Sequence, residues 1–330
     1  MNIRQIIFIF LLFLINTGIS AQPKGSYKNP ILERSMPDPT VVRDKEGNFY
    51  MFSTNMAKKV PIYTSSNLVD WRYFGDSFTS DQMPTGLDGG GIWAPDVIEY
   101  KGYFLMAYSY SKGGEIHHNG IGLAICPTPK GPFKNLGLLF TSDEAGVLNS
   151  IDPALVKDKN KLYLLWGSFH GIYITELLWN KKNQKFTVDL SSKVQLAGDI
   201  FEGAHIMKRG KYYYLFASIG SCCKRDESTY RVVVGRSLNL FGPYLDAHNL
   251  PMIENEYELF LSGNDKFVGP GHGSTIITDK DGKTWYIYHS YIKGEGEKGR
   301  RPMLDEVRWN KDGWPYIGEP TKDTTSAPRF

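Results

Sequence analysis

The stretch FEGAHIMKRGKYYYLFAS, residues 201–218, has the pattern of a β-hairpin that begins with a carboxylate. Apolar and aromatic strand formers flank a short Lys-Arg-Gly-Lys turn, as is typical of two antiparallel strands. Glu202 stands directly before the first strand, where a turn residue or an apolar residue is usual. The rest of the chain explains this acid, because the same pattern recurs along it.

Four further segments repeat a short apolar run, a polar turn and an aromatic-rich run that ends in Ser or Thr. One aromatic residue of each second run can be aligned, and the aligned residues follow one another at about 50 to 70 residues, which suits a four-stranded propeller blade. The five copies are residues 41–55, 97–111, 155–169, 206–220 and 276–290, and the aligned aromatics are Tyr50, Phe104, Tyr163, Tyr213 and Trp285.

These repeats predict an all-β fold, a five-bladed β-propeller that forms one domain over residues 22–330. Weaker strand signals after several hairpins, at 65–71, 122–133 and 233–244, indicate the outer strands of the blades. Long segments with helical periodicity are missing. The alternative is a β-sandwich in which the similarity of the hairpins is a coincidence.

The first 21 residues have the pattern of a secretory signal peptide. A basic start at Arg4 and an apolar run over residues 6–15 precede small residues at 18–22. A membrane anchor is the alternative, but the run is too short to span a bilayer comfortably. We therefore expect an exported protein, secreted or periplasmic, that has no membrane segment after cleavage and is a monomer.

Charge and cysteine content exclude some functions. The 330 residues carry 38 basic and 35 acidic side chains, a net charge of +3, without a dense Lys/Arg block, so nucleic acid and anionic membranes are poor candidates for partners. The 20 Tyr, 18 Phe and 7 Trp residues suit β-structure and also sugar binding. Of the three cysteines, Cys222 and Cys223 are adjacent, which allows at most a vicinal disulfide and does not match the spacing of zinc ligands.

A residue with functional chemistry stands at the head of each repeat, about a dozen positions before the aligned aromatic. In a propeller, these heads lie on a ring around the central axis, so three carboxylates would face one funnel. For a single Asp-Pro pair, the simpler interpretation is a turn cap. Like charges on one axis repel and need a reason to be kept. The five heads are Asp38, Trp93, Asp152, Glu202 and His272.

Hydroxyl and aromatic side chains are expected around the carboxylates. The second strands of the hairpins return to the ring and end in residues such as Ser168, and Ser150 stands close to Asp152. We predict that Ser150, Ser168 and the stacking surface of Trp93 bind a polyhydroxylated ligand, although such serines can also simply end strands. The Cys222-Cys223 pair follows the fourth hairpin and should flank Glu202.

Two carboxyl groups on either side of a glycosidic bond are sufficient to hydrolyse it. Glu202 has the longer reach and suits the general acid, and Asp38, between two prolines, suits a rigid general base. Asp152 would raise the pKa of the acid by charge repulsion. Opposite positions on the ring leave room for a water, which favours inversion of configuration.

His272 lies in a glycine-rich segment, VGPGHGS at 268–274. It could bind a metal, bind substrate or tune a carboxylate, but one histidine alone does not make a zinc site. The segment lacks the Lys-Ser/Thr of a phosphate-binding loop.

The motifs DPTVV, WAPDV, SIDPALV and EGAHI together resemble glycoside hydrolase family 43, over a span from Asn29 to Ile317. The resemblance implies five-bladed propellers that invert configuration at arabinose and xylose linkages. By position in the motifs, it also implies that Asp38 is the base, Asp152 the pKa modulator and Glu202 the acid.

Three further segments, at 222–246, 268–274 and 307–318, resemble the arabinan-degrading branch. That branch implies endo-acting cleavage of α-1,5-linked arabinan, a plant cell-wall polysaccharide. It also implies a calcium ion on the propeller axis, held by His272 and mostly by waters.

Two motifs depart from that branch. Pro37 stands where arabinan-cleaving members often have histidine, and the EGAH sequence is closer to exo-acting branches. Alternatives to an endo-arabinanase are therefore an exo-acting α-L-arabinofuranosidase or β-xylosidase, or a propeller that binds carbohydrate or protein without catalysis.

Overall fold

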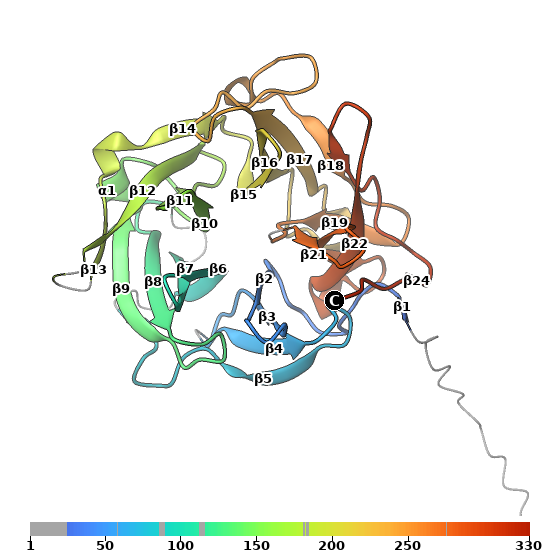
Figure 1. Ribbon diagram of the computed structural model, residues 1–330, viewed down its shortest axis with the longest axis horizontal. Coiled ribbons are helices and arrows are strands. Elements are labelled where there is room, and N and C mark those ends of the chain that lie inside the picture. The colour runs from blue at the N-terminus through green and yellow to red at the C-terminus, as the bar shows by residue number, and fades with distance from the viewer. Residues whose placement is uncertain are drawn as a thin grey trace, which may run out of the picture.

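The computed structural model describes residues 25–330 except residues 58, 86–89, 112–115, 181, 183–184 and 275. The predicted signal peptide, residues 1–21, lies outside the described residues. Apart from one two-stranded sheet formed by the ends of the described chain, the described strands form five antiparallel sheets arranged as blades around a central axis, which confirms the five-bladed β-propeller (Figure 1).

Each blade is built from consecutive strands, beginning with the strand nearest the axis. Blade 1 contains β2 (Thr40–Arg43), β3 (Phe49–Phe52), β4 (Pro61–Ser65) and β5 (Arg72–Asp76). Blade 2 contains β6 (Gly91–Tyr100), β7 (Tyr103–Ser111), β8 (Gly120–Cys126) and β9 (Lys134–Thr141). Blade 3 contains β10 (Ala154–Asp158), β11 (Lys161–Trp166), β12 (Ile172–Asn180) and β13 (Lys185–Val188), with β14 (Val194–Ala197) also paired to β12.

The last two blades follow the same order. Blade 4 contains β15 (Glu202–Arg209), β16 (Tyr212–Ile219), β17 (Arg231–Ser237) and β18 (Glu258–Leu261). Blade 5 contains β19 (Phe267–Gly271), β20 (Ile277–Thr278), β21 (Thr284–Ile292), β22 (Arg301–Trp309) and β23 (Pro315–Tyr316). The helices are short: α1 (Ser142–Ala145), η1 (Leu190–Ser192), η2 (Arg225–Glu227), η3 (Met252–Glu254) and η4 (Gly296–Lys298).

All five predicted hairpins are present, and the structure adds two details. The segments at 65–71, 122–133 and 233–244 contain the ends of third strands and the loops after them, whereas β5, β9, β13, β18 and β23 are outermost. In blade 5, the first strand is split into β19 and β20, which both pair with β21. His272 lies between them with a left-handed backbone (φ 42°), which interrupts the extended conformation of a strand.

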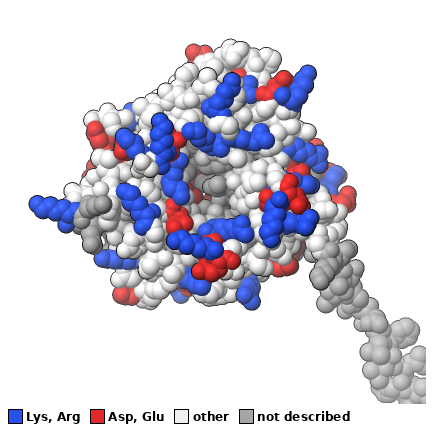
Figure 2. All heavy atoms as spheres, in the orientation of Figure 1, with Lys and Arg blue, Asp and Glu red and all other residues white. Residues whose placement is uncertain are grey.

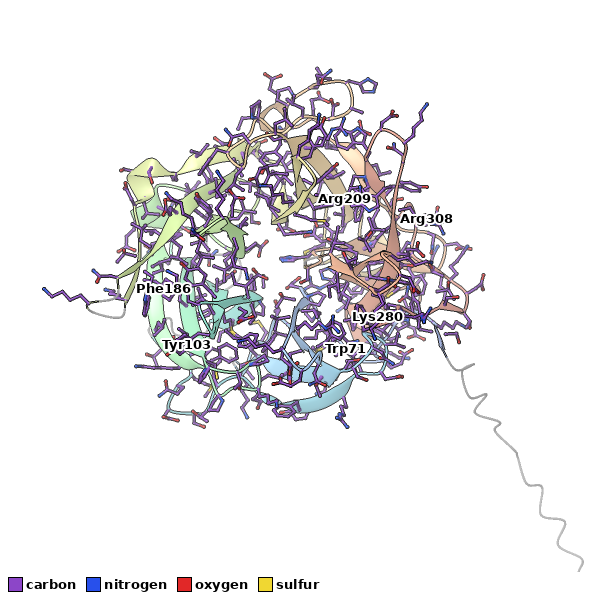
Figure 3. The ribbon with its side chains drawn as sticks, in the orientation of Figure 1. Trp71, Tyr103, Phe186, Arg209, Lys280 and Arg308 are labelled. Atoms are coloured by element: carbon purple, nitrogen blue, oxygen red, sulfur yellow. A yellow bond between two sulfur atoms is a disulfide. The ribbon has the colours of Figure 1, made fainter. Side chains whose placement is uncertain are left out.

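The core is divided into five apolar layers, one between each pair of neighbouring blades. Side chains fill these spaces (Figure 3), and the layer between blades 5 and 1, for example, joins Leu304 and Trp285 to Phe49. The other four layers are built in the same way. This division is expected of a propeller, because each sheet must bury both of its faces against neighbours.

The two ends of the described chain close the ring at blade 5. Strand β1 (Ser26–Tyr27) pairs with β24 (Thr325–Ser326). Buried Asn29 donates from Nδ2 to the Leu304 carbonyl at 3.0 Å and to Asp305 Oδ2 at 2.9 Å. The segment that precedes blade 1 is thereby held on the third strand of the last blade.

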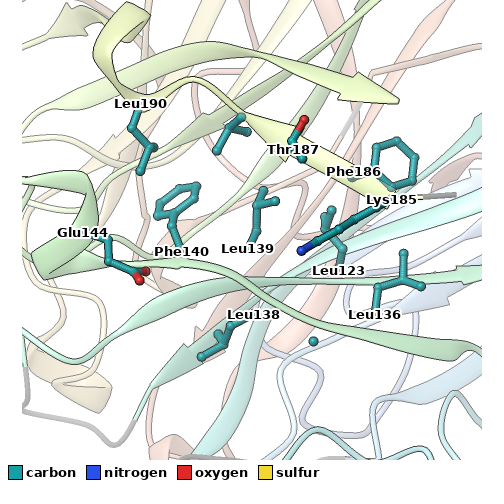
Figure 4. A pocket seen from close by; sticks show the side chains of 12 residues that line it. Leu123, Leu136, Leu138, Leu139, Phe140, Glu144, Lys185, Phe186, Thr187 and Leu190 are labelled. Atoms are coloured by element: carbon teal, nitrogen blue, oxygen red, sulfur yellow. The ribbon is translucent and has the colours of Figure 1, made fainter. Parts of the chain in front are cut away.

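Two features of the surface can be described from the structure. An apolar groove of about 560 Å³ runs between β9 and β13, the outermost strands of blades 2 and 3, and Phe140 and Phe186 line it (Figure 4). One face of the ring has a central hollow, with Lys and Arg side chains interspersed with Asp and Glu around it (Figure 2). Within the described part of the chain, the helices are all too short to cross a membrane.

Candidate active site

One residue with a left-handed backbone stands at the inner start of each blade. Residues with a side chain rarely adopt a positive φ, so four of them and one glycine at equivalent places indicate a constrained ring. The five are Asp38 (φ 54°), Ala94 (φ 41°), Asp152 (φ 57°), Gly203 (φ 56°) and His272 (φ 42°). The predicted heads Asp38, Asp152 and His272 occupy these places, whereas Trp93 and Glu202 stand one residue earlier.

The difference for Trp93 and Glu202 follows from irregular pairing. The register between β6 and β7 shifts between Trp93 and Asp96, and the register between β15 and β16 shifts between Glu202 and His205. Glu202 is therefore part of a strand, paired with Ser218, and its side chain lines the cavity at the propeller axis. This answers why an acid precedes the hairpin: it begins the innermost strand at the axis.

A cavity of about 410 Å³ on the axis collects the predicted carboxylates. We call it the acidic cavity. It also contains Trp93 and His272, so five of the seven predicted site residues line it. The lining residues used below are Asp38, Thr54, Trp93, Asp152, Glu202, Cys222, Cys223, Tyr230, His272 and Arg300.

Asp38 is held as an ionised carboxylate. Arg300 Nη1 donates to Asp38 Oδ1 at 2.9 Å, and the Thr54 hydroxyl donates to Oδ2. Burial alone would raise the pKa of Asp38, but these partners outweigh it and hold the pKa well below its ordinary value. After burial, the charge of Arg300 is the largest influence on this pKa, followed by His272 and His289. Burial lowers the pKa of both histidines.

Asp152 and Glu202 show the opposite shift. Burial, followed by the charges of Glu202 and Asp38, raises the pKa of Asp152 well above its ordinary value. Burial also raises the pKa of Glu202, although hydrogen bonds from the hydroxyls of Tyr230 and Ser168 oppose the shift. Two buried carboxyls that interact in this way retain a proton where an exposed carboxyl has lost it.

The hydroxyls at the ends of the second strands have a structural task that the sequence did not reveal. In three blades, the N–H of the left-handed residue donates to a hydroxyl of the preceding blade. Ala94 donates to Thr54 at 2.8 Å, Asp152 to Ser109 at 2.8 Å and His272 to Ser218 at 2.9 Å. For Asp38, the acceptor is His289 Nδ1 at 3.0 Å. We call these bonds the blade latches.

The latch differs at the predicted acid. Here the Ser168 hydroxyl donates to Glu202 Oε2 at 2.8 Å, and the Gly203 N–H donates to Asp152 Oδ2 at 3.1 Å. Ser168, predicted to bind substrate, is thus directed at the acid. The structure places Ser150, the other serine predicted to bind substrate, in the interior: it is fully buried and donates to the Val147 carbonyl at 2.9 Å.

His272 lies among the carboxylates. Its Nδ1 is 3.5 Å from Asp38 Oδ1 and 4.0 Å from Asp152 Oδ2. A Cβ at position 203 would lie only 2.8 Å from this nitrogen, so Gly203 makes room for the imidazole. Among the described residues, groups of three or more His, Cys, Asp or Glu side chains placed to hold a metal are absent. A cation beside His272 would therefore take mostly water ligands, which calcium tolerates.

A second, smaller cavity of about 30 Å³ continues along the axis and is lined by Thr40, Asp96 and His205. Asp96 Oδ1 accepts from the Thr40 hydroxyl at 2.9 Å, and Oδ2 accepts from the Leu155 N–H at 2.7 Å. Asp96 thereby ties together the strands that follow Asp38 and Asp152. Its place in the WAPDV motif was visible in the sequence, but its bridging role depends on blades 1 and 3.

Arg300 and Tyr230 are the main site residues that the sequence did not predict. Each directly precedes the third strand of its blade, β22 and β17 respectively. The sequence signal available was weak: a polar or aromatic residue before a third strand, where the chain turns at the rim of the axis.

Comparisons with known proteins place the chain in a family and agree with the fold. The sequence model of glycosyl hydrolases family 43 matches residues 27–315. The extracellular exo-α-(1→5)-L-arabinofuranosidase ArbA of Cellvibrio japonicus is 31% identical over 89% of this chain and 89% of its own length. The extracellular endo-α-(1→5)-L-arabinanase 1 of Bacillus subtilis is 32% identical over 84% of this chain and 86% of its own. The solved α-L-arabinanase of Cellvibrio cellulosa in complex with arabinohexaose aligns with a TM-score of 0.75 and 29% identity, and covers 86% of this chain and 95% of that one. The chain therefore belongs to glycosyl hydrolases family 43.

Proposed function

We propose that the protein hydrolyses α-1,5-linked L-arabinan with inversion of configuration. The observation that carries the proposal is the opposite pKa shift of neighbouring carboxyls in one cavity, with Asp38 ionised beside Arg300 and a proton kept by the Asp152–Glu202 pair. Relatives named for arabinan support the substrate.

The residues divide the reaction between them. Asp38 accepts a proton from the attacking water as the water bonds to the anomeric carbon. Glu202 donates its proton to the leaving sugar oxygen as the glycosidic bond breaks. Burial and the charge of Asp38 raise the pKa of Glu202. We assign the role of pKa modulator to Asp152, whose own pKa is raised by burial and by the charge of Glu202. Trp93 offers a ring surface for the apolar face of a sugar.

The cleavage mode that we propose is endo. The support is the similarity of segments 222–246, 268–274 and 307–318 to arabinan-degrading enzymes, together with the endo-arabinanase relative of Bacillus subtilis. An exo-acting arabinofuranosidase is the second candidate, because ArbA carries that name and the acid stands in an EGAH sequence. Products from linear arabinan separate the two: a ladder of oligomers for endo action, and only short products of one size for exo action.

Two variants test the chemistry. Asp38→Asn and Glu202→Gln should each lower kcat on linear arabinan by about 10³-fold or more, since each removes one partner of a proton transfer, and this loss lies within the usual range for such residues. Asp312→Asn and Glu319→Gln make the same chemical changes at exposed sites and should retain full activity. Arabinan hydrolysis retained by either cavity variant would refute the assignment, and a product with the same anomeric configuration as the substrate would refute inversion.

We also propose a calcium ion on the propeller axis, from the resemblance to the arabinan-degrading branch, and export of the protein. If calcium binds beside His272, it supplies a fixed positive charge there, and its addition should raise the melting temperature of the chelated wild type but not of His272→Ala. Equal effects on both proteins would exclude this site. We infer export from the signal-like start of the sequence and from relatives named extracellular, which N-terminal sequencing of the mature protein would test. The monomeric state stays a prediction, which light scattering would test.

A further inference from the structure

We propose that a disulfide between Cys222 and Cys223 forms a sugar-contacting wall of the acidic cavity on the side of the leaving group. The inference rests on the proposed function. The structure shows the two cysteines joined to each other, and both line the cavity that contains Asp38, Asp152 and Glu202.

The loop that carries the disulfide starts and ends beside the acid. It connects β16 to β17, and Ser218, near its start, is paired with Glu202. Tyr230, at its end, lines the acidic cavity together with Glu202. Because the general acid faces the leaving oxygen, the wall next to it faces the sugar that leaves.

The loop is anchored to its surroundings. The Ser228 hydroxyl donates to the Ser221 carbonyl at 2.6 Å and to the Cys222 carbonyl at 3.3 Å. Asp226 Oδ2 accepts from the Gly294 N–H of blade 5 at 2.9 Å, and Arg225 forms an ion pair with Glu297. The sulfur atoms are therefore held on a fixed backbone, as a binding wall requires.

Stabilisation of the fold does not explain the bond. A disulfide stabilises mainly by closing a loop in the unfolded chain, and a bond between adjacent residues closes almost none. Cys222 is half-buried and Cys223 is exposed, so neither belongs to a core layer. What the bond does change is the local surface: it replaces two rotatable thiols by one rigid group with polarizable sulfur and no hydrogen-bond donor.

Such a group suits the apolar C–H face of a furanose ring. Reduction would restore two thiols, which rotate and carry weak donors, and the wall would lose its shape. The effect should appear in the binding of substrates with a sugar leaving group, and it should be absent when the leaving group is a single atom.

The test compares oxidised and phosphine-reduced wild-type enzyme on two substrates, linear arabino-oligosaccharides and α-L-arabinofuranosyl fluoride. The phosphine gives two electrons to the S–S bond and is oxidised with an oxygen from water, which leaves two thiols. The third cysteine, Cys126, is free and buried, so reduction changes one bond. We expect KM for the oligosaccharide to rise about tenfold, the scale of a lost apolar contact in a binding pocket, while kcat/KM for the fluoride and the melting temperature stay unchanged.

Matched variants complete the test. The double variant Cys222→Ala/Cys223→Ala should have the KM of the reduced enzyme for the oligosaccharide, and the phosphine should not change it. In Cys126→Ala, the phosphine should raise KM as it does in the wild type. An unchanged KM after mass spectrometry confirms reduction, or equal losses on both substrates, would overturn the inference. If the oxidised enzyme hydrolyses neither substrate, the proposed function fails instead, and calorimetric binding of the oligosaccharide to both redox forms still decides whether the disulfide contacts it.

Discussion

Asp38 and Asp152 occupy equivalent places in blades 1 and 3, and both precede a proline, yet their pKa values shift in opposite directions. The difference comes from Arg300, which donates to Asp38 at 2.9 Å, whereas Asp152 is close to Glu202 without a comparable bond from a cation. Burial raises the pKa of any carboxyl, so the placement of one guanidinium decides which carboxyl can act as a base.

The first prediction concerns the pH profile. In Arg300→Ala, burial of Asp38 is no longer opposed by the guanidinium, so the pKa of the base should rise and the acidic limb of kcat/KM should move to higher pH. The alkaline limb should also move to higher pH, because Arg300 lowers the pKa of Glu202 and this influence is lost in the variant. Lys298→Ala, an exposed change on the same loop, should leave both limbs in place. An acidic limb that does not move would show that Arg300 does not set the charge of Asp38.

The second prediction concerns the stability of the same carboxyls. A carboxyl whose pKa is raised by folding favours the folded state below its unfolded pKa, and this contribution is lost as pH rises through the folded pKa. Asp152→Asn should therefore raise the free energy of unfolding near pH 7 and bring little change near pH 3. Asp38→Asn should lower it by about 3–5 kcal/mol at pH 7, because a buried Arg300 loses its partner.

Urea denaturation of both variants and the wild type at the two pH values measures these effects. Destabilisation of Asp152→Asn at pH 7 would contradict the raised pKa of Asp152. It would mean that the Asp152 carboxylate is stabilised in the folded protein, as Asp38 is.

At the scale of elements, the blade latches fix how neighbouring sheets meet at the axis. In three blades, a hydroxyl near the end of one hairpin accepts from the left-handed residue that starts the next blade, as Ser109 does from Asp152 at 2.8 Å. At blade 1, His289 Nδ1 accepts from Asp38 instead. The latch at blade 4 is the exception, since Ser168 serves Glu202 and the Gly203 N–H uses the carboxylate of Asp152. At the acid, two bonds that involve carboxylates stand in place of the usual latch, and they connect the segment around Glu202 to Asp152.

The third prediction separates these two kinds of serine. Ser168→Ala removes a hydrogen bond that favours ionised Glu202, so the pKa of the acid should rise and the alkaline limb of kcat/KM should move to higher pH. Ser109→Ala leaves a buried N–H without its acceptor and should cost about 1–3 kcal/mol of stability, with the alkaline limb unchanged. Equal displacement of the limb in both variants would show that Ser168 acts only through the fold.

At the scale of the whole molecule, the ring must close, and the segment before blade 1 closes it on blade 5. Asn29, which is 2% exposed, donates to Leu304 and Asp305, and the Leu304 N–H donates back to Asn29 Oδ1 at 2.9 Å. Tyr27 adds a bond from its hydroxyl to the Leu304 carbonyl at 2.7 Å. These contacts lie on β22, the strand that Arg300 precedes. The same strand therefore closes the ring and positions a residue of the site.

The fourth prediction tests closure apart from chemistry. Asn29→Ala removes three hydrogen bonds in the interior and should lower the free energy of unfolding by about 3 kcal/mol, while kcat and KM at 25 °C change little. Thermal melting and initial rates measure the two effects. The control is Lys28→Ala, a change at the exposed neighbouring position, which should alter neither quantity. A large change in KM for Asn29→Ala would show that closure reaches the cavity.

The five hairpins, the propeller and the three carboxylates at its axis could all be predicted from the amino-acid pattern, because strand patterns and turn residues are local and recur at the spacing of a blade. The group that keeps Asp38 ionised could not be predicted, since Arg300 and Asp38 are far apart in the chain and meet through closure of the ring. The folded ring also assigned Ser109 and Ser168 to different tasks and directed Ser150 into the interior. Charge state and hydrogen-bond partners depend on burial and on neighbours from other blades, and these are properties of the assembled ring.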